Sequence, residues 1–159
     1  MKHLSRILSL LILVSAGLFL ANCGGSDPKP KSDEEVQLGK LSGTWGELVS
    51  AELDGVERKD DFPGLKLKIS GLFEANGDYD YDFIAGTRPT PSPWPKADKW
   101  SFGSDVNSKI IRKPDDLIVS YVVDDTQLTL SLDCPSGGCD FAGGRVGSNS
   151  GTWVFVFNK

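Results

Sequence analysis

The chain has 159 residues, of which 39% are hydrophobic and 25% are charged, and its formal net charge is −5. This length suits a single domain, and the acidic balance argues against electrostatic binding to nucleic acid or to anionic lipid. The one histidine is His3, so the rest of the chain cannot use an imidazole as general base, nucleophile activator or metal ligand.

The first 21 residues have the layout of a secretory signal. Lys2 and Arg6 precede an apolar run over residues 7–21, which corresponds to a basic region followed by a short hydrophobic core. A helix that spans a bilayer needs roughly 20 apolar residues, and this run is shorter. We therefore expect secretion rather than a permanent transmembrane helix.

The sequence Leu20-Ala21-Asn22-Cys23 resembles the lipobox of bacterial lipoproteins. The resemblance implies that residues 1–22 are removed and that Cys23 carries acyl chains such as palmitate. It departs from the usual pattern at Asn22, where a small residue is common. The alternative is an ordinary signal peptide with an unrelated cysteine near its end. Gly24 in place of an aspartate implies, by the same resemblance, the outer membrane of a Gram-negative bacterium, with the face of that membrane left open.

Residues 23–40 form the next segment, which contains mostly Gly, Ser, Pro, Lys, Asp and Glu. This composition is typical of a flexible, solvated linker, so we predict a tether between the lipid and a domain over residues 41–159. Removal of residues 1–22 takes away two cations and no acid, which changes the net charge from −5 to −7.

From Leu41 onward the hydrophobic period is two, as in half-buried strands. Residues 65–70 alternate apolar and polar side chains, Asn76-Gly77 is a hairpin-turn dipeptide whose two residues tolerate positive φ, and residues 79–83 alternate again. We predict six further strands, at residues 44–53, 100–103, 109–113, 117–123, 126–132 and 152–157.

Eight short strands joined by tight connections predict an all-β fold. The turns between neighbours include Pro114-Asp115-Asp116 and Asp124-Asp125. This pattern indicates an antiparallel eight-stranded meander, which closes into a barrel and so removes its unpaired edges. A β-sandwich is the alternative architecture.

Gly43-Thr44-Trp45 at the first strand resembles the opening motif of the lipocalins, and Phe73, Gly77 and Tyr79 resemble a hairpin of lipocalin-like bacterial proteins. The resemblance covers residues 41–159. It implies a lipocalin-like barrel with Trp45 at its base and a small apolar ligand inside. Lipocalins place an arginine after the last strand, over that tryptophan, whereas here only Asn158 and Lys159 follow, and Arg145 precedes the strand.

Cys134 and Cys139 flank the sequence Pro-Ser-Gly-Gly. In a secreted chain, two cysteines at this spacing favour a structural disulfide over a metal or redox site. We predict no metal and no cofactor.

Two loops hold the candidate binding residues. Trp94 lies in residues 88–95, which include four prolines. A stiff extended loop of this kind suits partner or glycan binding if the indole is exposed; the alternative is that Trp94 folds back and caps the barrel. Arg145 lies in the glycine-rich residues 143–151, a second candidate binding loop.

Carboxylates supply the remaining candidates. Asp78, Asp80 and Asp82 share one strand face, which is either a calcium-binding pattern or, as we favour, a solvated surface. Glu47, Glu52 and Glu74 are the carboxylates that could point inward and act on a glycoside, if two of them converge.

We therefore expect a non-enzymatic envelope lipoprotein. The first hypothesis is that it binds a small apolar molecule in the barrel. The second is an interaction module that uses the loop around Trp94 to bind an envelope protein or glycan, and the third is a carboxylate hydrolase.

Overall fold

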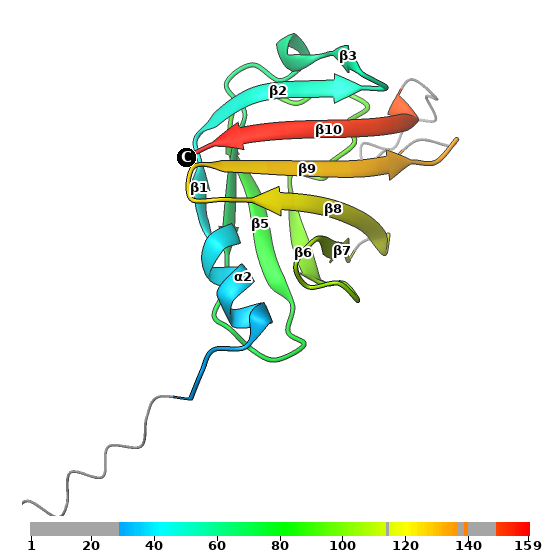
Figure 1. Cartoon of the computed structure of the whole chain (residues 1–159). Helices are drawn as coiled ribbons and strands as arrows, with labels where there is room; N and C mark the ends of the chain where they lie inside the picture. The colour runs from blue at the N-terminus through cyan, green and yellow to red at the C-terminus, as the bar shows by residue number, and fades with distance from the viewer. Residues whose placement is uncertain (1–28, 114, 137–138, 140–148) are drawn as a thin grey trace, which may run out of the picture. The chain divides into compact units, whose positions relative to one another are not determined.

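The computed structural model describes residues 29–113, 115–136, 139 and 149–159 (Figure 1). Every element lies in the unit formed by Lys31–Lys159. The helices are α2 (Asp33–Leu41) and the short 3-10 helix η1 (Lys59–Asp61). The strands are β1 (Gly43–Trp45), β2 (Glu47–Leu53), β3 (Val56–Glu57), β4 (Lys66–Ser70), β5 (Tyr79–Ala85), β6 (Ala97–Phe102), β7 (Lys109–Arg112), β8 (Leu117–Val123), β9 (Gln127–Cys134) and β10 (Gly151–Asn158).

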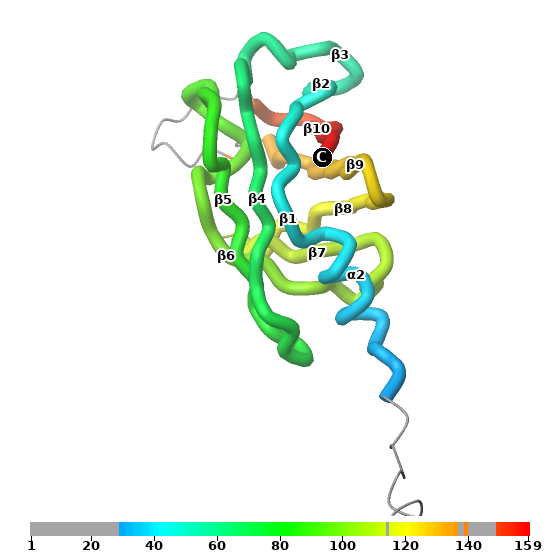
Figure 2. Tube along the Cα trace, turned by 90° about the vertical axis from the view of Figure 1, so that its left-hand side faces the viewer, coloured from blue at the N-terminus to red at the C-terminus, as the bar shows by residue number. Residues whose placement is uncertain are grey.

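The strands form one antiparallel sheet in the order β1-β4-β5-β6-β7-β8-β9-β10-β2-β3. β1 pairs with β4 near one end of this order, and β2 pairs with β10 near the other. Only Gly46 separates β1 from β2, so one continuous segment connects the two ends, and the sheet curls into a barrel-like circuit (Figure 2).

The prediction of an all-β antiparallel fold is confirmed, but the strand count differs. The predicted strand at residues 44–53 is two strands, because the chain leaves β4 and joins β10 at Gly46. β3 is an additional two-residue strand that pairs with Glu52 and Leu53 of β2. All the described strands belong to one hydrogen-bonded sheet, rather than to the two sheets of a sandwich.

Side chains alternate between the interior and the surface along each long strand. On β10, Trp153, Phe155 and Phe157 are buried, and the residues between them are partly exposed. The same period of two places Tyr79, Tyr81 and Phe83 of β5 inside. The strands therefore line the interior with aromatic rings, and burial of this apolar area is the main force that stabilises the fold.

The predicted hairpin between β4 and β5 is present, with a longer connection than expected. The last register pair is Ser70 with Asp80, and a turn forms where Gly77 N donates to Glu74 O at 2.8 Å. Asn76 has a positive φ of 57°. The turn therefore centres on residues 75–76 instead of on Asn76-Gly77.

The predicted tether is wrong over its second half, because Asp33–Leu41 is helical. The Ser32 hydroxyl caps the helix by accepting a hydrogen bond from Glu35 N at 3.2 Å. The negative charges of three acidic residues in the first turn interact favourably with the positive end of the helix dipole. Leu38 and Leu41 are buried, so this face packs on the core. A nine-residue helix with two such leucines is too short to produce the hydrophobic stripe that would predict it.

Trp45 joins this helix to the barrel. Its indole N–H donates to Leu41 O at 2.9 Å, and its ring is fully buried. Lys159 follows the last strand, and its ammonium nitrogen lies 4.8 Å from the centroid of the Trp45 ring. A lysine thus makes a cation–π contact with this tryptophan.

The predicted disulfide is confirmed. Cys134, at the end of β9, is bonded to Cys139, and their Cα atoms are 5.2 Å apart. Both residues are buried. The link closes the chain just beyond β9.

We predict that Leu41→Ala lowers the free energy of unfolding by about 3 kcal/mol, because it leaves a cavity between α2 and the barrel. Urea denaturation followed by tryptophan fluorescence measures this change. The control is Lys40→Ala, at an exposed neighbouring position of the same helix, which should change the stability by less than about 0.5 kcal/mol. Equal stabilities for the two variants would show that α2 does not dock.

Candidate functional site

The proline-rich loop, residues 86–96, joins β5 to β6 and folds against the barrel. At its start, Gly86 has a φ of 84°, and a Cβ there would lie 2.4 Å from the carbonyl carbon of Gly64. Only glycine allows this approach of two backbones. Thr87 N then donates to Pro63 O at 3.1 Å, so the loop begins fixed to the turn before β4.

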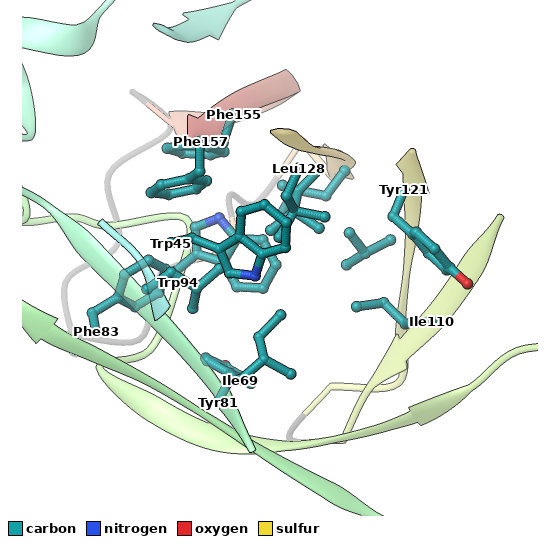
Figure 3. Close-up of a cluster of buried hydrophobic side chains, with 14 of the residues drawn as sticks. Trp45, Ile69, Tyr81, Phe83, Trp94, Ile110, Tyr121, Leu128, Phe155 and Phe157 are labelled. Carbon is teal, nitrogen blue, oxygen red and sulfur yellow. The ribbon is translucent and has the colours of Figure 1, made fainter. Parts of the chain in front are cut away.

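Trp94 turns from this loop into the interior. Its side chain is only 4% exposed. Its ring centroid lies 5.7 Å from that of Tyr81, 6.1 Å from Phe83 and 6.3 Å from Phe155, all in edge-to-face contact (Figure 3). The indole is therefore not exposed, as binding through Trp94 itself would require, and the other interpretation of the sequence, that Trp94 folds back into the barrel, is correct.

Arg112, which was not among the residues predicted for the site, holds this loop in place. Its guanidinium is fully buried. Nε and Nη2 donate to the two carboxylate oxygens of Asp115 at 2.9 and 2.6 Å, and Nη1 donates to Pro93 O at 2.6 Å. The guanidinium carbon also lies 5.1 Å from the centroid of the Trp94 ring. These contacts stabilise a buried charge that would otherwise be costly.

Two further contacts complete the loop. Arg88 Nη1 donates to Trp94 O at 2.5 Å, and Trp94 N donates to Ser92 Oγ at 3.3 Å. Ser92 is itself buried. Hydrogen bonds on both sides of Trp94 therefore fix its backbone.

The interior behind Trp94 is almost filled. The cavity there measures about 20 Å³ and is lined by nine residues, which is room for about one water molecule. Its lining residues are Leu67, Ile69, Tyr81, Phe83, Trp94, Trp100, Ile110, Arg112 and Leu130. Burial raises the pKa of the Tyr81 hydroxyl well above its usual range, so this group is a neutral phenol at physiological pH.

Two larger hollows lie at the surface. One, of about 250 Å³, is formed by the proline-rich loop itself, from Arg88 to Lys96, with Trp94 in its wall. Among the described residues that line it, Arg88 and Lys96 are charged and none is acidic. The other, of about 290 Å³, lies between β2 and η1 and mixes Glu47 and Asp60 with Lys59.

The predicted glutamates do not converge with one another. Glu47 and Glu74 are exposed, and Glu52 instead lies beside Glu57, a residue that the sequence analysis missed. The Ser50 hydroxyl is 2.8 Å from Glu57 Oε2 and 3.3 Å from Glu52 Oε1.

Glu57 holds the chain that follows β3 against β2. Its carboxylate accepts from Ser50 and from the backbone amides of Ala51, Arg58 and Lys59, and these bonds, the Ser50 bond first, lower its pKa. A general acid needs a raised pKa. Glu57 is thus arranged to fix the backbone.

Asp80 of β5 is exposed on the outer face, whereas Asp82 is half-buried and its Oδ1 has no hydrogen-bond partner among the described residues. Asp80 pairs with Lys99 at 3.5 Å, and Asp78, just before the strand, pairs with Lys113 at 3.2 Å. Over the described parts of the chain, no group of three or more His, Cys, Asp or Glu side chains could hold a metal ion.

Two predicted site residues, Cys23 and Arg145, lie outside the described residues, as does most of the glycine-rich segment at 143–151. Trp45, the third binding candidate, is buried under α2 and Lys159. In the segments that are described, no helix is long and apolar enough to cross a membrane.

Comparison with known proteins gives no relative. No protein-family model, curated protein or solved structure matches the chain significantly. The function must therefore be inferred from the geometry of the site.

We predict that Asp115→Ala lowers the free energy of unfolding by about 3 kcal/mol, because the buried Arg112 guanidinium then loses its carboxylate. Urea denaturation measures the loss. Asp125→Ala, which removes an exposed carboxylate from another turn, should change the stability by less than about 0.5 kcal/mol. A similarly small effect at Asp115 would mean that the ion pair does not support the fold.

Proposed function

We propose that this chain is a bacterial envelope lipoprotein whose domain binds a partner through the surface of the proline-rich loop. In this proposal Cys23 carries the lipid that anchors the protein to the outer membrane. The signal-like residues 1–21 and the sequence Leu20-Ala21-Asn22-Cys23 support the anchor. Two or three acyl chains hold a protein firmly to a bilayer, whereas one does so only marginally.

We also propose that the domain is lipocalin-like. The continuous segment through Gly46 joins the two ends of the sheet order, as a barrel requires. Trp45 lies buried at the first strand, and the Lys159 ammonium lies over its ring. In lipocalins an arginine after the last strand supplies this cation. We propose that Lys159 takes its place here, where no arginine follows the strand.

The observation that carries the surface-binding proposal is the contrast between the interior and the loop. The interior retains about 20 Å³, whereas the hollow of the proline-rich loop measures about 250 Å³. A ligand cannot enter the first without moving side chains, but a group from a partner can enter the second.

The chemistry of the hollow indicates the kind of group. Arg88 and Lys96 line it on a chain whose net charge is −5. Prolines and the contacts of Arg88 and Arg112 order the loop in the free protein, which reduces the entropy lost on association. We therefore propose that the partner, an envelope protein or glycan, presents an acidic group to this hollow.

Carriage of a small apolar molecule inside the barrel is the second candidate. The apolar character of most residues around the interior cavity favours it. Catalysis by carboxylates has no such support, because Glu57 is fixed by backbone amides.

We predict that Cys23→Ala abolishes both membrane retention and incorporation of labelled palmitate. Cell fractionation and metabolic labelling measure the two effects. The matched control replaces Cys134 and Cys139, the other two cysteines of the chain, with serine, and it should keep the label. Labelling that survives Cys23→Ala, or that is lost in the control, would contradict a lipid on Cys23.

We predict that a photo-crosslinking amino acid at Thr90, in the wall of the hollow, captures a partner in cells. The same group at Lys66, on the outer face of β4, is the control and should not. Lys96→Glu should abolish the crosslink at Thr90, because it reverses a charge in the hollow. A crosslink that persists in Lys96→Glu, or that forms equally at Lys66, would contradict binding of an acidic group at this site.

A further inference from the structure

We propose that Trp94 is a displaceable plug, and that the seat it occupies takes a flat aromatic molecule bearing a hydrogen-bond acceptor. This inference concerns the interior of the barrel. It rests on the second candidate function, binding inside the barrel, for which it names the entrance and the ligand class, and it does not rest on binding at the surface.

Trp94 separates two spaces. It lines the interior cavity of about 20 Å³ and also the surface hollow of about 250 Å³. It is the one residue common to the two sets of lining residues that the structure describes. Withdrawal of its indole would therefore join the hollow to the interior.

The position of Trp94 in the chain permits such a movement. It belongs to the connection between β5 and β6, and its backbone is held by Arg88 and Ser92 rather than by pairing with another strand. The segment around Trp94 can thus move while the backbone hydrogen bonds at the two ends of the loop, from Thr87 N to Pro63 O and from Phe83 N to Lys96 O, stay in place. The side chains on the other walls, such as Tyr81, Trp100 and Leu130, lie on strands and would keep their places.

The four tryptophans of the chain divide into two kinds. The indole N–H groups of Trp45 and Trp153 each donate to a backbone carbonyl at 2.9 Å, from Leu41 and Asn149. Those of Trp94 and Trp100 are buried and have no acceptor among the described residues. The two tryptophans whose indole N–H groups lack an acceptor are thus the two that line the interior cavity.

A third donor belongs to the same cavity. The buried Tyr81 hydroxyl has no hydrogen-bond partner in the described parts of the chain. A buried donor without an acceptor is unfavourable, and the Trp94 indole adds a donor to this wall without supplying an acceptor. An occupant that carried a carbonyl or similar oxygen could satisfy a donor that Trp94 leaves unsatisfied.

The seat is also selective for a ring. Tyr81, Phe83 and Phe155 meet the Trp94 ring edge to face, and the Arg112 guanidinium lies 5.1 Å from its centroid. These contacts favour an aromatic face over an aliphatic chain. The ligand class is therefore a flat aromatic molecule of about indole size with an acceptor on its rim.

The test uses the full chain, purified in detergent and labelled with 5-fluorotryptophan. The four fluorine signals are assigned with single Trp→Phe variants and followed as indole or indole-3-carboxaldehyde is added. We expect the Trp94 signal to shift saturably toward the solvent-exposed position while the Trp45 and Trp153 signals stay in place. The aldehyde should bind about 5-fold more tightly than indole, because it supplies one hydrogen-bond acceptor.

Two variants test the donor. Tyr81→Phe should reduce the preference for the aldehyde, whereas Tyr79→Phe should retain it, because the Tyr79 hydroxyl already donates to Glu74 O at 2.9 Å. Trp94→Ala should bind both probes more tightly than the wild type, since no plug has to leave.

Specific results would overturn the inference. A Trp94 signal that does not move at saturating probe, or that moves together with those of Trp45 and Trp153, shows that the ring is a fixed part of the core. Equal affinities for the two probes contradict the proposed ligand class. These results hold even if Trp94→Ala fails to fold, because they come from the wild-type chain.

Discussion

The buried guanidinium of Arg112 is the constraint on which the arrangement of the site depends. A cation inside an apolar barrel is stable only if other groups supply its solvation. Asp115 supplies the charge, Pro93 O accepts a hydrogen bond, and the Trp94 ring lies against the cation. The proline-rich loop therefore folds inward, which fills the interior and leaves a hollow on its outer side.

The strand β10 connects this region to the other end of the barrel. Phe155 contacts Trp94, and Lys159, one residue beyond the strand, lies over Trp45. Trp45 in turn donates to the end of α2. One end is thus closed by a helix and a cation–π pair, and the other by a loop whose tryptophan lacks an indole acceptor among the described residues. Binding is therefore expected at the loop end of the barrel.

The sequence predicted those features that depend on local pattern. The all-β class followed from the alternation of residues such as those of β5 and β10, and the Cys134–Cys139 bond followed from spacing. It did not predict α2, whose two buried leucines are too few to show a helical period. It left two positions open for Trp94, because the choice between them depends on a residue 18 positions later. Arg112 was missed because charge usually indicates an exposed position, although its spacing from Ile110 on β7 places both on one face.

Hydrogen exchange of the loop tests the role of Arg112 most directly. Amide exchange across residues 86–96 and across β8, β9 and β10 would be compared between the wild-type chain and Asp115→Ala, under conditions in which both are folded. The account predicts that protection at Trp94, whose amide donates to Ser92, falls strongly in the variant while the three strands retain theirs. Unchanged protection of the loop, or an equal loss in the loop and the strands, would contradict the claim that Arg112 holds Trp94 in the barrel.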